Sequence, residues 1–114
     1  MHPDGTEGPD RLVGTSGADV ICGLGGDDRV EGAGGDDVLY GDAGTDRVVG
    51  GAGADTLYGD EGVDRLDGGD GADVLSGGPD ADRLSGDLGA DHLEGGGGGD
   101  RCVGDAADDQ PADC

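Results

Sequence analysis

The sequence predicts an all-β fold, a solenoid of parallel strands in which each coil is built from two nine-residue repeats. Three features recur in phase along the 114-residue chain: an Asp every nine residues, a Gly five residues before it, and an aliphatic residue two residues after it. The repeated aspartates are Asp10, Asp19, Asp28, Asp37, Asp46, Asp55, Asp64, Asp73, Asp82, Asp91, Asp100 and Asp109. Chance does not keep three kinds of position in phase over this length, so the chain is an ordered repeat.

Each repeat divides into a glycine-rich half and a short apolar half. Repeated glycines permit positive φ, so the first half is expected to form a tight turn. The second half has one aliphatic residue between two polar or variable ones, which predicts a three-residue strand with its middle side chain pointing inward. The inward residues are Leu12, Ile21, Val30, Leu39, Val48, Leu57, Leu66, Leu75, Leu84 and Leu93, and the series ends at Cys102 and Pro111.

A longer period of 18 residues sets the size of one coil. The six arginines all lie 18 apart, at Arg11, Arg29, Arg47, Arg65, Arg83 and Arg101. In the alternate repeats the same position holds Val20, Val38, Thr56, Val74, His92 and Gln110. Two strands and two turns therefore make one coil, and about six coils stack with their strands roughly 4.8 Å apart. No single repeat can bury the thin aliphatic core alone, which is the property of a solenoid.

Two stretches carry a resemblance to a known family. Residues 50–58 (GGAGADTLY) and 68–76 (GGDGADVLS) resemble the RTX, or hemolysin-type, nonapeptide repeat, and the similarity extends from Gly5 to Val103. The resemblance implies a right-handed parallel β-roll that binds Ca²⁺ between neighbouring turns through aspartate carboxylates and turn carbonyls. We expect three parts: a lead-in at 1–4, the roll at 5–103, and a degenerate last repeat that caps it at 104–114.

Oxygen ligands on glycine-rich turns favour Ca²⁺, whereas Mg²⁺ demands stricter geometry and zinc or copper prefers imidazole or thiolate. In an 18-residue coil, alternate aspartates share an edge. The candidate ligands on one edge are Asp10, Asp28, Asp46, Asp64, Asp82 and Asp100, which make five sites between neighbours. On the other edge Asp19, Asp37, Asp55, Asp73 and Asp91 make four. The sequence thus predicts about nine Ca²⁺ ions, or ten if Asp109 takes part, although Ala107 and Pro111 interrupt its repeat.

Charge predicts that calcium binding and folding are coupled. The chain has 28 acidic residues against six arginines, a formal net charge of −22, and only two aromatic residues, both Tyr. Without cations, stacked carboxylates repel one another, and the small core offers little compensation. One alternative is an acidic calcium buffer without a stable fold. Another is an adhesin or an ice-binding solenoid, although the threonines do not form the regular array that ice binding requires.

The same charge excludes other functions. Nucleic acid and anionic membranes would be repelled, and no apolar run is long enough to span a membrane. There is no Ser/His/Asp set in register, no P-loop and no EF-hand loop, so an enzyme is not expected. His2 and His92 are isolated, which argues against a transition-metal site. Export to the outside of the cell is implied by the resemblance, although the residues after Met1 show no apolar signal segment.

Two outer surfaces are expected. The arginines form a ladder on one sheet, either as solvated charge beside Glu31 and Asp67 or as an anion- or glycan-binding stripe. The other sheet presents Val20, Val38, Tyr40, Tyr58 and Val74, either as ordinary exposed strand residues or as a surface for a partner protein or a second copy.

The three cysteines predict at most one disulfide within the chain. Cys22 and Cys102 lie about four coils apart, roughly 20 Å, which is too far for a bond. A bridge between Cys102 and Cys114 would pin the C-terminal end, and two reduced thiols there are the alternative. Cys22 would then stay a thiol or pair outside this sequence.

One turn departs from the pattern. Pro79 and Asp80 occupy its third and fourth positions, and ten of the twelve repeats have Gly at the fourth. If that position needs positive φ, Asp80 is strained, and Asp80→Gly should raise the melting temperature.

Overall fold

The computed structural model describes residues 5, 8–87, 89 and 91–104. Within this part of the chain every regular element is a β-strand, and the strands are short, most of them three residues long. The predicted division of each repeat into a turn and a three-residue strand is therefore confirmed. None of the described residues belongs to a helix with the length and apolar character that a membrane crossing needs.

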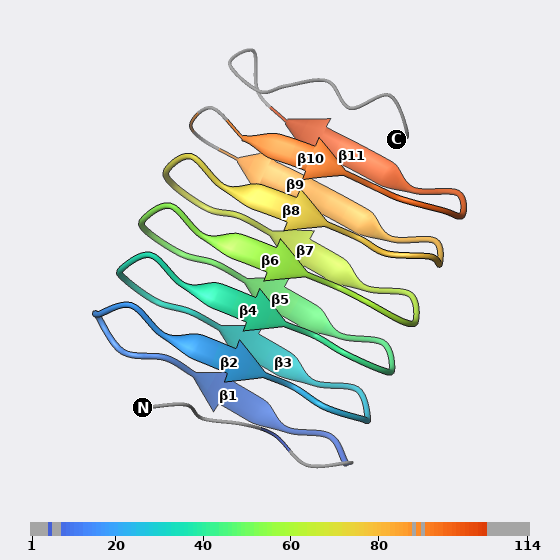
Figure 1. Cartoon of the computed structure of the whole chain (residues 1–114), viewed down its shortest axis with the longest axis horizontal. Helices are drawn as coiled ribbons and strands as arrows, with labels where there is room; N and C mark the ends of the chain where they lie inside the picture. The colour runs from blue at the N-terminus through green and yellow to red at the C-terminus, as the bar shows by residue number, and fades with distance from the viewer. Residues whose placement is uncertain (1–4, 6–7, 88, 90, 105–114) are drawn as a thin grey trace.

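The strands form two parallel sheets. The first sheet contains β1 (Arg11–Val13), β3 (Arg29–Glu31), β5 (Arg47–Val49), β7 (Arg65–Asp67), β9 (Arg83–Asp87) and β11 (Arg101–Gly104). The second contains β2 (Val20–Cys22), β4 (Val38–Tyr40), β6 (Thr56–Tyr58), β8 (Val74–Ser76) and β10 (His92–Glu94). The chain alternates between the sheets at every strand, so two consecutive strands and two turns close one coil (Figure 1).

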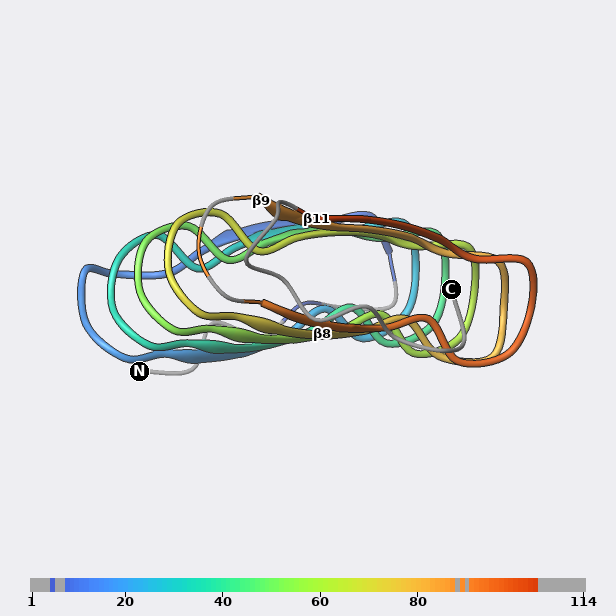
Figure 2. The same cartoon turned by 90° about the horizontal axis from the view of Figure 1, so that it is seen from above.

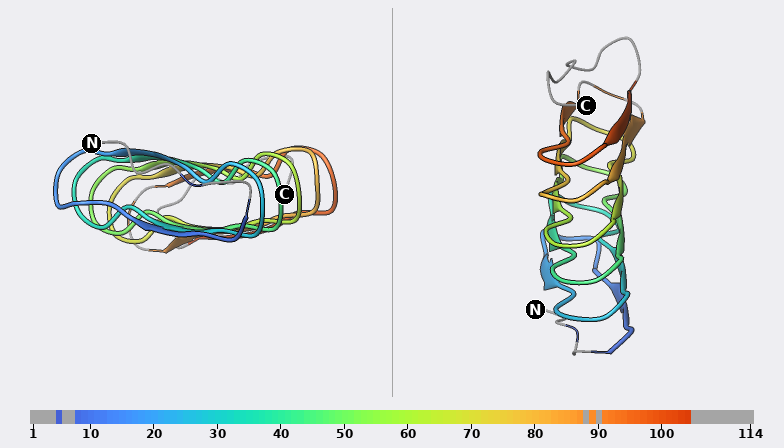
Figure 3. Two further views of the ribbon diagram at one scale, coloured as in Figure 1. Left: turned by 90° about the horizontal axis from the view of Figure 1, so that it is seen from below. Right: turned by 90° about the vertical axis from the view of Figure 1, so that its right-hand side faces the viewer.

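Successive coils stack with residues 18 apart in direct register. Leu39 pairs with Leu57, which pairs with Leu75, and the arginines pair in the same way along the first sheet. The coils wind in a right-handed sense, as the resemblance implies (Figure 1). The two sheets face each other closely, so the molecule is a flattened slab with extents of 35 × 30 × 12 Å (Figures 2 and 3).

The core is a double file of aliphatic side chains between the sheets. These residues are at most 2% exposed and comprise Ile21, Val30, Leu39, Val48, Leu57, Leu66, Leu75, Leu84 and Leu93. Leu12 and Cys102, near its two ends, are partly buried against it. The prediction of one inward aliphatic residue per strand is thus confirmed. The core is only one side chain deep, so it leaves a large share of the fold to be held by the turns.

Left-handed backbone occurs at two turn positions, of which we expected one. The fourth position is left-handed at most of its glycines, including Gly53 and Gly62, as expected. The second position is left-handed as well, even where it holds Leu24, Ala33 or Asp42, whose φ values are 68°, 70° and 64°. Such a conformation strains a residue that has a Cβ.

The expectation for Asp80 was wrong. Asp80 is not among the described residues with positive φ. Its Oδ2 instead accepts a hydrogen bond of 2.7 Å from the backbone N–H of Gly62 in the preceding coil. Because this aspartate links two coils without adopting left-handed backbone, Asp80→Gly removes a contact and relieves no strain.

The outer faces of the two sheets differ in character. The first sheet presents the exposed arginine column, with residues such as Glu31, Val49 and Asp67 beside it. The second presents Tyr40 and Tyr58, whose rings stack with centroids 5.0 Å apart, next to a row that includes the exposed Val74. Self-association through this second face stays a prediction.

Candidate metal centre

The repeated aspartates form two columns, one along each turn edge of the slab. We call Asp10 and every ninth residue through Asp100 the ladder aspartates. Each stands at the end of a turn, immediately before a strand, so the turn fixes its side chain relative to the neighbouring coil. The most buried ones are 1–5% exposed and comprise Asp19, Asp28, Asp37, Asp46, Asp55, Asp64, Asp73, Asp82 and Asp91. Asp10 and Asp100, at the ends of one column, are half-buried.

One oxygen of each carboxylate is fixed by the preceding coil. The Oδ1 of Asp46 accepts a hydrogen bond of 2.8 Å from the backbone N–H of Asp28. The same bond, at 2.7–2.8 Å, recurs for each ladder aspartate from Asp28 to Asp100. A carboxylate held in this way cannot rotate out to solvent, so the ladder is preorganised.

The second oxygen is buried and accepts no hydrogen bond. This holds for the Oδ2 atoms of Asp28, Asp37, Asp46, Asp55, Asp64, Asp73, Asp82 and Asp100. Buried polar atoms are nearly always paired, and a buried anionic oxygen without a partner carries a large desolvation penalty. A regular series of such atoms therefore requires a cation or a bound proton.

The space beside these oxygens exists because the first residue of each turn is glycine. A Cβ placed on Gly50 would lie 2.7 Å from both the Oδ2 of Asp55 and the carbonyl oxygen of Gly68 in the next coil. The same pair of oxygens meets at Gly59, with Asp64 and Gly77 each at 2.8 Å. A carboxylate and a main-chain carbonyl thus converge from two coils, as the ligands of a hard cation do.

Side chains alone do not complete such a site. Among the described residues, no group of three or more His, Cys, Asp or Glu side chains converges on one point. Any cation at the turns must therefore take backbone carbonyls in addition to carboxylates, which suits Ca²⁺ with its six to eight oxygen ligands.

The raised pKa values of the ladder aspartates show that their charged form is unfavourable when no cation is bound. Burial raises the pKa of Asp46 to about 7, and that of both Asp64 and Asp73 to about 8. The hydrogen bond from the neighbouring ladder backbone lowers each pKa, and the charge of the neighbouring ladder aspartate raises it again. Near neutral pH the metal-free ladder is therefore poised between holding protons and bearing an unfavourable charge.

This predicts a pH dependence of the calcium-free protein. An aspartate in an unfolded chain titrates near 3.9. Burial raises the pKa of Asp55 to about 6 and that of Asp64 to about 8 in the folded ladder. From the unfolded pKa of about 3.9 up to these raised values, the fold therefore binds more protons than the unfolded chain. Its stability is therefore present in acid and falls as the pH rises through this window. In EDTA we expect a far-UV β signal near pH 4 that is lost by pH 8, and a signal that grows with pH would contradict the ladder electrostatics.

Several other aspartates join coils rather than face the ladder, which sequence reasoning missed. Asp27 and Asp36 accept hydrogen bonds from the N–H groups of Thr45 and Ala54, each 18 residues later. Asp42 accepts one from the N–H of Leu24, 18 residues earlier. A signal was available for the first two, since each directly precedes a ladder aspartate and so points across the same turn.

Two predictions concern the C-terminal end. Cys102 is disulfide-bonded. Its expected partner Cys114 and the doubtful ligand Asp109 lie outside the described residues, so the pairing and the tenth site stay predictions.

Comparison with known proteins identifies the repeat. A model of the RTX calcium-binding nonapeptide repeat, four copies long, matches residues 4–39, 40–75 and 76–111. A search of curated proteins found no match, and neither did a search of solved structures. The three stretches cover nearly the whole chain, including all ladder aspartates from Asp10 to Asp100. The chain therefore belongs to the RTX family of calcium-binding nonapeptide repeat proteins.

Proposed function

We propose that this RTX chain is a calcium-triggered folding module, in which the ladder aspartates from Asp10 to Asp100 bind about nine Ca²⁺ ions between neighbouring coils. The observation that carries the proposal is the series of buried Oδ2 atoms that accept no hydrogen bond. In six of these turns the Oδ2 and a carbonyl oxygen of the adjacent coil both border the first glycine, namely in the turns of Asp28, Asp37, Asp46, Asp55, Asp64 and Asp82. The proposed roll comprises residues 5–103, with 1–4 as a lead-in and 104–114 as a cap.

Neutralisation of charge supports coupling between binding and folding. The net charge is −22, and nine divalent ions would supply +18, which leaves about −4 on the folded protein. The roll places ladder carboxylates one coil apart, roughly 4.8 Å, and burial makes their charge costlier still. The unfolded chain escapes both penalties by keeping its carboxylates hydrated and apart. Calcium therefore favours the roll, and its removal favours the unfolded chain.

This coupling suits a protein that works outside the cell. Extracellular calcium modules bind with dissociation constants of roughly 10⁻⁴–10⁻³ M, matched to the calcium concentration there. A chain that remains unfolded until it meets such a concentration would be exported unfolded and fold on arrival. We propose this location for the chain, in keeping with the usual setting of its family.

The threonine positions weigh against an ice-binding solenoid. Among the described residues, Thr56 lies on strand β6, whereas Thr15 and Thr45 lie in turns. They do not form a row on a sheet face, so the described surface lacks the regular hydroxyl array of such proteins.

The proposal is tested by counting the bound ions. Native mass spectrometry of the calcium-loaded chain at neutral pH should show a main species with about nine Ca²⁺ ions, gained over a narrow range of calcium concentration. A broad distribution of a few ions, unchanged by mild denaturation of the chain, would identify an acidic buffer instead.

A further inference from the structure

The outer face of the first sheet carries a straight row of positive charge. Arg11, Arg29, Arg47, Arg65, Arg83 and Arg101 pair in direct register along its six strands, and all six are exposed. Neighbouring side chains are therefore anchored roughly 4.8 Å apart. In a chain of net charge −22, this row gathers every arginine on one face.

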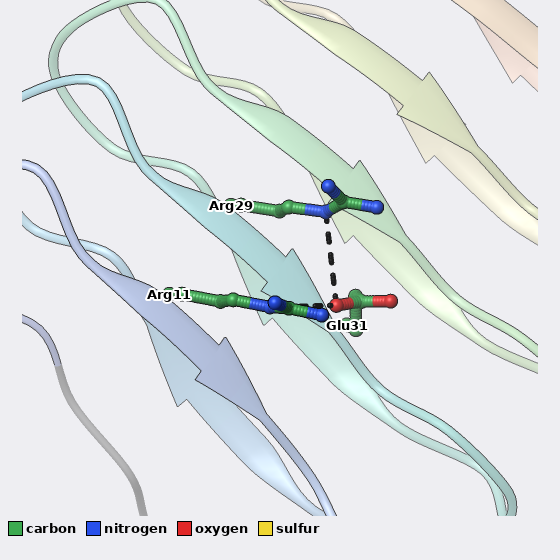
Figure 4. A network of polar contacts seen from close by, with 3 residues as sticks. All are labelled: Arg11, Arg29 and Glu31. Carbon is green, nitrogen blue, oxygen red and sulfur yellow. Dashed lines mark ion pairs between the residues drawn. The ribbon is translucent and has the colours of Figure 1, made fainter.

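One carboxylate of the protein already shows how an acid fits between two of these arginines. The Oε2 of Glu31 lies 3.6 Å from the Nε of Arg11 and 3.7 Å from the Nε of Arg29 (Figure 4). A single carboxylate oxygen thus bridges two neighbouring arginines of the row. The side chain of Arg11 is 70% exposed and that of Arg29 is 48% exposed, so the bridge lies at the surface.

Farther along the row this arrangement is not repeated by the protein itself. Within the part of the chain that the structure describes, no carboxylate lies within 4.0 Å of the guanidinium nitrogens of Arg47 or Arg83. The residues that take the place of Glu31 on those strands are Val49 and Ser85. Arg47 and Arg83 therefore present a place for external anions, whereas Arg65 has Asp67 two residues later on its own strand.

Shallow grooves flank the row. One, of about 460 Å³, is lined by Arg65, Arg83 and Arg101 together with Asp67, Ser85 and Asp87. The other, of about 340 Å³, lies along Arg47, Arg65 and Arg83, and its lining also includes Thr45, Val63 and the ladder aspartates Asp28, Asp46 and Asp64. The arginines can take the acid groups of a polymer, and the carboxylates of the grooves can accept hydrogen bonds only from its hydroxyl groups.

We propose that this face binds a linear polysaccharide whose sugars carry carboxylates, with the acid groups seated between successive arginines as Glu31 is between Arg11 and Arg29. A single row one side chain wide fits a single extended polymer. A membrane or a nucleic acid duplex would present a broad anionic surface to the acidic turn edges on both sides of the row. The proposal rests on the calcium loading proposed above, because the bound ions remove most of the opposing charge.

The test uses the calcium-loaded chain and polygalacturonate as the probe. The variant Arg47→Gln/Arg65→Gln/Arg83→Gln removes the central charges. The matched control Val38→Gln/Thr56→Gln/Val74→Gln changes the same strand position in the second sheet. We expect wild type and control to bind equally and the arginine variant to bind roughly tenfold more weakly, the sum of three modest surface ion pairs. Neutral dextran should not bind.

Circular dichroism of every sample in calcium separates the two proposals. An arginine variant that folds with calcium and loses the polymer supports this inference. If it folds and binds polygalacturonate as wild type does, the polymer is held by calcium at the turns and the inference is wrong. Stronger binding to dextran sulfate or to phosphatidylserine vesicles than to polygalacturonate would also overturn it. Failure of wild type to fold with calcium contradicts the proposed function instead.

Discussion

Gly53→Ala is expected to abolish calcium-induced folding or to lower the melting temperature of the calcium-loaded protein by more than any conservative surface change. Gly53 has a φ of 104°, in the left-handed region that disfavours a Cβ by roughly 1–2 kcal/mol. The new Cβ would also overlap the carbonyl oxygen of Gly35, directly below it in the stack. Because the overlap is with backbone, it can be relieved only by separating two coils.

Gly17→Ala is the matched control, since Gly17 occupies the same position in its repeat. Its φ is not in the left-handed region, and the nearest atom to a new Cβ would be the Oγ1 of Thr15 at 3.7 Å. We therefore expect its stability to stay within about 0.5 kcal/mol of wild type. Thermal melts in saturating calcium measure both variants. If both variants have the melting temperature of wild type, the inference that the turns stack too tightly to admit a Cβ is wrong.

Asp64→Asn is expected to have effects of opposite sign with and without calcium. The amide oxygen can still accept the hydrogen bond from the N–H of Asp46, but the charge is gone. Burial raises the pKa of Asp64 to about 8, so its loss of charge should stabilise the calcium-free roll at pH 8. Calcium affinity depends on ligand charge, so the midpoint of calcium-induced folding should rise roughly tenfold.

Asp70→Asn provides the control for net charge, because it removes one carboxylate from an exposed turn position. Its calcium midpoint should stay close to that of wild type. Asp64→Ala should destabilise the calcium-loaded protein more than Asp64→Asn, since it also leaves the buried N–H of Asp46 without an acceptor, at a cost of about 1–3 kcal/mol. Calcium titrations followed by circular dichroism rank the three variants. Equal midpoints for Asp64→Asn and Asp70→Asn would mean that calcium senses only the overall charge.

The period of the sequence predicts most of this fold because each coil of a solenoid contains the same number of residues in the same arrangement. Nine residues per repeat determine which side chain of each strand points inward, and 18 residues per coil determine which residues pair between coils. Leu57 therefore packs between the sheets in register with Leu39 and Leu75, as a count along the chain predicts.

Contacts between coils were less predictable, because they depend on the exact path of the turn. The hydrogen bond from the N–H of one ladder aspartate to the Oδ1 of the aspartate 18 residues later cannot be predicted from the sequence of a single repeat. The left-handed second position was missed because Leu24 and Ala33 occupy it as well as glycine. Asp80 was misjudged for a related reason, since its neighbour Gly62 supplies a hydrogen bond that one repeat cannot reveal.

The central claim, that this chain folds because it binds calcium, is tested most directly by far-UV circular dichroism of the wild-type chain at pH 8. In EDTA the spectrum should be that of an unfolded chain. Millimolar Ca²⁺ should convert it to a β spectrum, and Mg²⁺ at the same concentration should not, because its stricter geometry does not fit ligands drawn from two coils. A β spectrum in EDTA at this pH, or an equal response to Mg²⁺, would contradict the account.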